Sequence, residues 1–148
     1  MSLKDQLTEA MKEAMKAKQV DRLSTIRQLR SAIKNKEIEL GRELDDDAVI
    51  SVIGTLVKQR REAAQMYRDN ARPELADKEE AELAVLQEYL PAQLSEDEVR
   101  AVVAAVVAEV GATSLKDLGK VMPQVMARTK GAAEGKLVSR LVRELLDS

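Results

Sequence analysis

The sequence contains no cysteine and no histidine. The lack of cysteine excludes a disulfide framework, a thiolate zinc site and a thiol nucleophile. The lack of histidine removes the usual general base and the commonest metal ligand. Enzymes can work with lysine, serine or carboxylates instead, so an enzymatic role stays open. For the chain by itself we expect no metal site, no cofactor and no catalytic residue.

Aromatic residues are almost absent, since Tyr67 and Tyr89 are the only two. The core must therefore be built from Leu, Val, Ile, Ala and Met, a set of residues that favours helices. The longest apolar run, residues 101–108, is far too short to cross a bilayer, and no apolar leader segment follows the start. We therefore expect a cytoplasmic all-α protein that makes no contact with membranes.

Apolar residues recur every three or four positions, which is the pattern of amphipathic helices. The pattern runs over about residues 2–18, 21–40, 45–70 and 73–89, and then over about residues 95–110, 114–129 and 134–146. Pro91 forces the residue before it out of the helical conformation and ends the fourth helix. The sequence thus predicts an N-terminal domain of about four helices, residues 1–91, and a small three-helix C-terminal domain, residues 92–148.

Several helix ends carry recognisable signals. Asp21 is placed to cap the second helix, and residues 43–47 form an acidic cluster before the third. That cluster lacks the spacing of a calcium loop, so we interpret it as a cap and first turn, where carboxylates complement the helix dipole. Ser95 and Glu98 have the spacing of a capping box. Pro123 lies inside the sixth helix and predicts a kink or a break there.

Basic residues are concentrated near the C-terminus. Residues 116–143 hold seven basic and two acidic side chains, a net charge of +5 on a chain whose total charge is −2. A cationic segment on an otherwise acidic protein suggests a surface that faces a polyanion, with nucleic acid as the first candidate. The residues proposed for RNA contact in this part are Lys120, Arg128, Lys130, Lys136, Arg140 and Arg143.

The seventh helix is expected to turn its basic stripe outward and its apolar side inward. The residues expected in the core from this helix are Leu137, Val138, Leu141, Val142 and Leu145.

A second cationic patch lies on the second helix, where Arg27, Arg30 and Lys34 follow one another at positions i, i+3 and i+7. A solvated surface is the preferred interpretation of this patch, and a nucleic-acid contact is the alternative. Proteins that read single-stranded RNA usually stack bases on aromatic side chains, which the C-terminal part lacks. Any RNA contact would therefore involve backbone and shape, would weaken steeply with salt, and would show no DNA specificity.

Arg60 lies in the middle of the apolar side of the third helix, and Glu79 and Glu82 fall inside the apolar stripe of the fourth. An antiparallel hairpin with its turn near residue 71 would bring Arg60 level with residue 82. Because an unpaired charge on a core-facing stripe is costly, we expect Arg60 to form an ion pair with Glu79 or Glu82. An active site could use the same residue types, but nothing else catalytic lies nearby, so a structural pair is preferred.

Residues 130–136 form a basic, glycine-bearing turn that resembles a phosphate-binding loop. The turn is one residue short of the P-loop spacing, lacks the Ser or Thr after the lysine and follows no strand, so it does not predict nucleotide hydrolysis. Backbone amides at the start of the seventh helix, flanked by Lys130 and Lys136, could hold one phosphate of a larger polyanion. A turn between two helices needs no ligand, so both interpretations stay open.

Several segments together resemble the YqeY-like proteins of the GatB/YqeY family. These segments are residues 25–35, 72–79 (RPELADKE), 89–95 (YLPAQLS) and 118–122 (LGKVM), followed by Lys130 and Gly131. The resemblance covers essentially the whole chain and implies two all-helical domains, shared with the C-terminal portion of the GatB component of the glutamine-dependent aspartyl/glutamyl-tRNA amidotransferase. In that enzyme the tail is linked to tRNA recognition, while the kinase and amidase chemistry lies elsewhere.

One departure from the family pattern concerns the glycine-bearing turn. The family commonly has a basic residue directly after the first glycine and an aspartate before the next, where this chain has Ala132 and Glu134. The expected phosphate contact therefore moves to Lys130, Lys136, Arg140 and Arg143.

Three functional hypotheses follow. The first, which we prefer, is a non-catalytic accessory protein that binds tRNA or another structured RNA. The second is an adaptor that docks onto an aminoacyl-tRNA synthetase or an amidotransferase. The third, implied by the resemblance, is a component or relative of a carbon–nitrogen ligase with glutamine as amido-N-donor.

Overall fold

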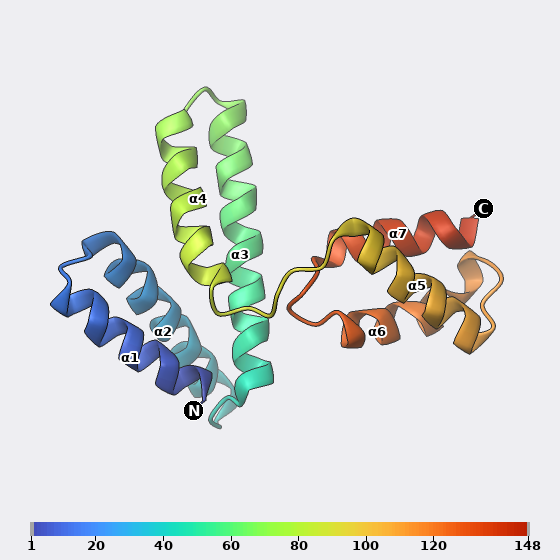
Figure 1. Ribbon diagram of the computed structural model, residues 1–148, viewed down its shortest axis with the longest axis horizontal. Coiled ribbons are helices and arrows are strands. Elements are labelled where there is room, and N and C mark those ends of the chain that lie inside the picture. Colours follow the sequence, from blue (N-terminus) through green and yellow to red (C-terminus); the bar gives the residue numbers. More distant parts are fainter. Residues whose placement is uncertain (1, 148) are drawn as a thin grey trace. The chain divides into compact units, whose positions relative to one another are not determined.

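The computed structural model describes residues 2–147, and every regular element within that range is a helix (Figure 1). The expected all-α fold class is therefore confirmed. One compact unit ends at Leu90 and a second begins at Pro91. The assignment of residues 1–91 and 92–148 as two functional domains stays a prediction. No helix within residues 2–147 is long and apolar enough to span a bilayer.

The first unit is built from two antiparallel helical hairpins (Figure 1). In one hairpin α1 (Leu3–Lys16) packs against α2 (Val20–Leu40), and in the other α3 (Asp46–Asp69) packs against α4 (Pro73–Gln87). Burial of an aliphatic side chain stabilises a fold by roughly 1.5–3 kcal/mol, so their shared core holds the hairpins together. The buried residues of this core are Leu7, Leu29, Ile33, Leu44, Val49, Ile53, Val57 and Leu86.

The second unit packs three helices around a core of valines. These helices are α5 (Glu96–Val110), α6 (Leu118–Arg128) and α7 (Gly135–Asp147), and a short 3-10 helix (Leu115–Asp117) leads into α6. Because β-branched residues are slightly unfavourable in helices, tertiary packing stabilises these elements more than propensity does. The buried residues are Val99, Val103, Val106, Val121, Val125, Val138, Leu141, Val142 and Leu146.

Two of the predicted helix starts are confirmed. The Asp45 Oδ1 atom accepts a hydrogen bond of 2.9 Å from the Ala48 N–H, and residues 46–47 lie in the first turn of α3. The acidic cluster is thus a cap and first turn, as expected. Ser95 and Glu98 form the predicted capping box at the start of α5, with both reciprocal hydrogen bonds present.

One other prediction about helix ends is wrong, and a second is wrong in part. Asp21 is not the cap of α2, because the left-handed backbone of Lys18 (φ 57°) lets the helix begin at Val20, with Asp21 inside the first turn. Pro123 does not break α6, which continues from Leu118 to Arg128, and the kink expected as the other outcome stays a prediction. The valines on either side of the proline are fully buried, and this packing holds the helix together despite the lost hydrogen bond.

The prediction that Leu145 belongs to the core is also wrong. Its residue surface is 41% exposed, whereas the adjacent Leu146 is buried. Leu145 borders a hollow of about 350 Å³ that Val103, Ala104 and Leu141 also line. Leu146, one helical turn after the buried Val142, takes the core position at this end of α7.

Arg60 forms an ion pair at the seam between α3 and α4. Its Nε atom lies 3.2 Å from Glu82 Oε2, and only 14% and 18% of the two side chains are exposed. An Nη2 hydrogen bond to Gln28 Oε1 links the same guanidinium to α2. Among the described residues Arg60 therefore pairs with Glu82 rather than with Glu79, and it connects three helices of the first unit.

Removing the Glu82 carboxylate tests how much this pair stabilises the fold. Glu82→Gln leaves a mostly buried guanidinium without its counter-charge, so we expect the free energy of unfolding to fall by about 1–3 kcal/mol. The matched control is Glu80→Gln, which affects the exposed pair with Arg68 and should cost less than about 1 kcal/mol. Urea unfolding followed by circular dichroism measures both, and equal effects would contradict the assigned role.

Candidate nucleic-acid interface

The two helices of the first hairpin enclose an open groove of about 590 Å³. Residues Lys4, Arg27, Arg30 and Lys34 contribute four cations to its lining, against one carboxylate, that of Glu37. The remaining lining residues are Leu7, Thr8, Met11, Ser31 and Ile33. The structure therefore places the predicted stripe of α2 on the wall of a concave, cationic surface.

The only carboxylate in the groove lining, that of Glu37, already has two partners within the fold. Lys4 Nζ lies 2.7 Å from Glu37 Oε2, and the Leu44 N–H donates to the same oxygen at 2.9 Å. The Lys4 hydrogen bond and then the Leu44 amide hold the pKa of the Glu37 carboxyl below its ordinary value. The same contact raises the pKa of Lys4. Both groups are therefore charged at neutral pH, and they largely cancel each other.

The other three cations of the groove have no carboxylate within ion-pair distance among residues 2–147. Arg27 and Lys34 are exposed, whereas Arg30 is half-buried. Arg30 Nη1 reaches across to α1, where it lies 2.9 Å from the Sδ atom of Met11. A thioether is a weak acceptor and carries no charge, so the guanidinium is not neutralised. The groove thus keeps a net positive charge that the fold does not use.

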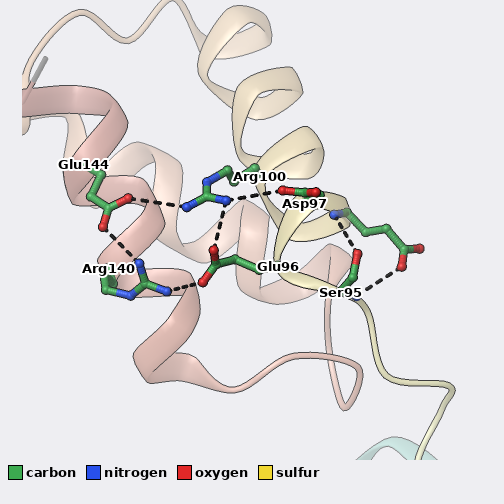
Figure 2. Close-up of polar contacts among 7 residues, drawn as sticks. Ser95, Glu96, Asp97, Arg100, Arg140 and Glu144 are labelled. Carbon is green, nitrogen blue, oxygen red and sulfur yellow. Dashed lines mark hydrogen bonds and ion pairs between the residues drawn. The ribbon is translucent and has the colours of Figure 1, made fainter.

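In the second unit, the arginines of the C-terminal patch are mostly paired. Arg140 contacts Glu96 on α5 and lies 3.0 Å from Glu144 on its own helix. Arg100 joins the same group of charges, with distances of 2.9 Å to Glu96 and 4.0 Å to Glu144. Figure 2 shows this network across α5 and α7. Arg140 and then Arg100 lower the pKa of Glu96, so the network is fully charged at neutral pH.

Arg128 is also engaged by a carboxylate. Both of its terminal nitrogens donate to the Glu109 carboxylate, a two-point contact between α6 and α5. This contact lowers the pKa of Glu109 and raises that of Arg128. Bidentate arginine–carboxylate pairs are the strongest of the exposed ion pairs. Arg128 is therefore less available to a ligand than its position in the sequence suggests.

Three of the six predicted C-terminal contacts share one hollow. Lys136, Arg140 and Arg143 border a shared open hollow of about 590 Å³, together with the acidic Glu144 and Asp147. The other three residues, Lys120, Arg128 and Lys130, do not line it. Lys120 lies 3.8 Å from the Asp117 carboxylate, and Lys130 is exposed. The structure thus brings together half of the predicted C-terminal contacts, beside two carboxylates.

Two backbone amides of the glycine-bearing turn form hydrogen bonds within the turn. The N–H groups of Ala132 and Ala133 both donate to the Thr129 carbonyl, at 2.8 and 3.2 Å. The turn carbonyls are also occupied, because Gln93 Nε2 donates to Gly131 and the Leu94 N–H donates to Ala132. These bonds involve the turn itself and not the amides at the start of α7, so the expected phosphate contact there stays a prediction.

Sequence reasoning did not find Lys4 or Met11 as groove residues. Both lie on α1, and nothing in their local pattern indicates that they face the cations of α2. Within the described range no three acidic side chains converge in a way that could hold a metal ion.

The sequence model of the YqeY-like proteins matches residues 4–146. The chain belongs to this family. The predicted family resemblance is therefore confirmed, and it spans both compact units.

Curated relatives are also similar to part of the chain. The mitochondrial protein named altered inheritance of mitochondria protein 41 of Lachancea thermotolerans is 39% identical over 85 residues, which are 57% of this chain and 46% of that protein. The protein of the same name from Eremothecium gossypii is 39% identical over 87 residues, 58% and 48% of the two chains. The Saccharomyces cerevisiae (strain YJM789) protein is 35% identical over 81 residues, 54% and 44%. The matched part of the chain spans about half the length of these relatives.

These names correct the expectation of a cytoplasmic protein. The relatives are named as mitochondrial proteins, which points away from the cytoplasm. The expectation rested on the lack of an apolar leader, and such a lack excludes only targeting signals that are apolar.

Acidification tests the assignment of the Lys4–Glu37 pair. The pKa of Glu37 is lower in the folded protein than its ordinary value of 4.5. The contribution of the pair to the free energy of unfolding is therefore fully present above pH 4.5 and is lost as the pH falls through the lowered pKa. Glu37→Gln keeps an acceptor for the Leu44 amide but removes the charge. We expect the melting temperature of this variant to lie below that of the wild type at pH 7 and to converge with it in acid.

The exposed carboxylate of Glu39 on the same helix gives a matched control, since Glu39→Gln should leave the curve of melting temperature against pH nearly unchanged. A constant difference between Glu37→Gln and the wild type at every pH would contradict the electrostatic assignment.

Proposed function

We propose that this YqeY-like protein is a non-catalytic accessory protein that binds tRNA or another structured RNA through its phosphates. The observation that carries the proposal is the α1–α2 groove, in which Arg27, Arg30 and Lys34 lack carboxylate partners. Phosphate contacts supply most of the affinity of sequence-independent nucleic-acid binding. A groove wall with three cations that have no carboxylate within ion-pair distance has the charge and the hydrogen-bond donors for such contacts.

The C-terminal patch contributes less in this account. Arg128 and Arg140 must exchange a carboxylate for a phosphate before they can contribute, which reduces the gain from each contact. Exposed ion pairs are worth at most about 1 kcal/mol, so a polyanion can displace the carboxylates, but with a smaller net gain. The family resemblance to the tRNA-linked tail of the amidotransferase supports an RNA ligand without identifying the surface used.

The hydroxyl groups of this chain give little support to a catalytic role as a carbon–nitrogen ligase. Several of them donate to a backbone carbonyl one helical turn earlier, which is a structural bond and not the activation of a nucleophile. These are the hydroxyls of Thr8, Thr25, Ser51, Thr55 and Thr129. A glutaminase assay on the purified protein should give no activity above background.

Charge reversal in the groove tests the proposed function. For the double variant Arg27→Glu, Arg30→Glu we expect at least a roughly tenfold loss of tRNA affinity at low salt, since each lost phosphate contact removes a favourable charge interaction. The slope of log affinity against log salt should fall by about 0.7–0.9 for each lost contact. Filter binding at several salt concentrations measures both quantities.

The matched control is Lys12→Glu, Lys36→Glu, which makes the same change in charge at exposed lysines that already lie beside Glu9 and Glu39. This control should weaken binding only a few-fold, by long-range repulsion. Arg140→Glu, Arg143→Glu should have an intermediate effect. Failure of the wild type to bind tRNA at low salt, or equal losses in the groove variant and the lysine control, would refute the proposal.

A further inference from the structure

Arg30 and Met11 form a platform inside the α1–α2 groove. The Arg30 side chain crosses from α2 to α1 and is half-buried, with its Nη1 atom 2.9 Å from Met11 Sδ. The contact places a planar cation beside a polarizable sulfur atom. Two other arginines of the first unit contact carboxylate oxygens of another helix or its end, Arg22 with Glu88 and Arg60 with Glu82. The platform is therefore the unusual feature of this groove.

A nucleobase is the kind of group that such a platform would accept. Guanidinium planes stack on bases in RNA-binding proteins, and methionine sulfur makes favourable contacts with aromatic rings. Neither tyrosine of the chain lines the groove, so any stacking there would depend on Arg30 and Met11.

The outer cations of the groove are spaced for the backbone of the same ligand. Arg27 and Lys34 are seven residues apart on α2, which corresponds to about 10 Å along the helix. Both are exposed, whereas the platform between them lies deeper in the groove. Phosphates on either side of a bound base could therefore reach these two side chains.

The dimensions of the groove favour a single strand over a duplex. A volume of about 590 Å³ falls within the range of roughly 300–1,000 Å³ typical of pockets that hold drug-sized groups, a class that includes a nucleotide. A duplex is too wide for a furrow between two helices with axes about 8–10 Å apart. Its bases are also already stacked on one another and offer no face to the platform.

We infer that the α1–α2 groove binds an unpaired nucleotide of single-stranded RNA, with the base against Arg30 and Met11 and the phosphates at Arg27 and Lys34. This inference rests on the proposed RNA-binding function and names the part of the RNA that the groove takes. Duplex regions of the same RNA contact only the exposed cations.

Fluorescence anisotropy with two probes tests the inference. One probe is an unstructured, labelled RNA of about eight nucleotides, and the other is the blunt duplex that it forms with its complement. We expect the wild type to bind the single strand roughly tenfold more tightly than the duplex, the effect of stacking one base. Arg30→Lys keeps the charge and removes the plane, so it should lower the single-strand affinity far more than the duplex affinity and abolish this preference.

Arg27→Lys is the matched control, because it makes the same substitution at a position where only the charge is used, and it should preserve the preference. Met11→Leu replaces the sulfur with little change in volume and should reduce single-strand affinity by a smaller factor. Circular dichroism verifies that each variant is folded.

Equal affinity for the two probes in the wild type, or an unchanged preference in Arg30→Lys, overturns the inference and leaves the proposed function standing. Binding of neither probe and no tRNA by the wild type refutes the proposed function, and the inference falls with it.

Discussion

Arginine–carboxylate pairs between helices determine which cations of this protein can meet a ligand. About a third of the residues are charged, and helices packed through narrow aliphatic stripes bring many of these charges close together. Where an arginine finds a carboxylate across a helix seam, as Arg60 finds Glu82 and Arg128 finds Glu109, its charge is used within the fold. Where it finds none, as in the α1–α2 groove, the charge stays available to a partner.

This constraint links the structure to the proposed function. A cluster of basic residues in the sequence measures only how much positive charge a segment carries, and not how much of it remains after folding. The C-terminal segment carries the larger charge, yet Arg140 shares its charge with Glu96 and Glu144. The stripe on α2 carries fewer cations, but their charge stays available to a ligand. The one carboxylate of the groove lining, that of Glu37, is bound to Lys4 and to a backbone amide.

The sequence was sufficient to predict the helices but not the pairing of their charges. Helical periodicity and local caps such as Ser95 with Glu98 depend on residues within one turn of each other, so they can be found by inspection. Arg140 and Glu96 are 44 residues apart, and their contact depends on how α7 packs against α5. The groove has the same origin, since Met11 meets Arg30 only after two helices have packed. Arg60 and Glu82 were predictable because a short hairpin fixes the register of its two helices.

The most direct test of this account is a titration of the isotope-labelled protein with single-stranded RNA, followed by amide chemical shifts. The account predicts that the largest shift changes fall on residues 4–11 of α1 and 27–34 of α2, which line the groove, with smaller changes on α7. Changes confined to α7 and the turn before it, or no change at low salt, would contradict it.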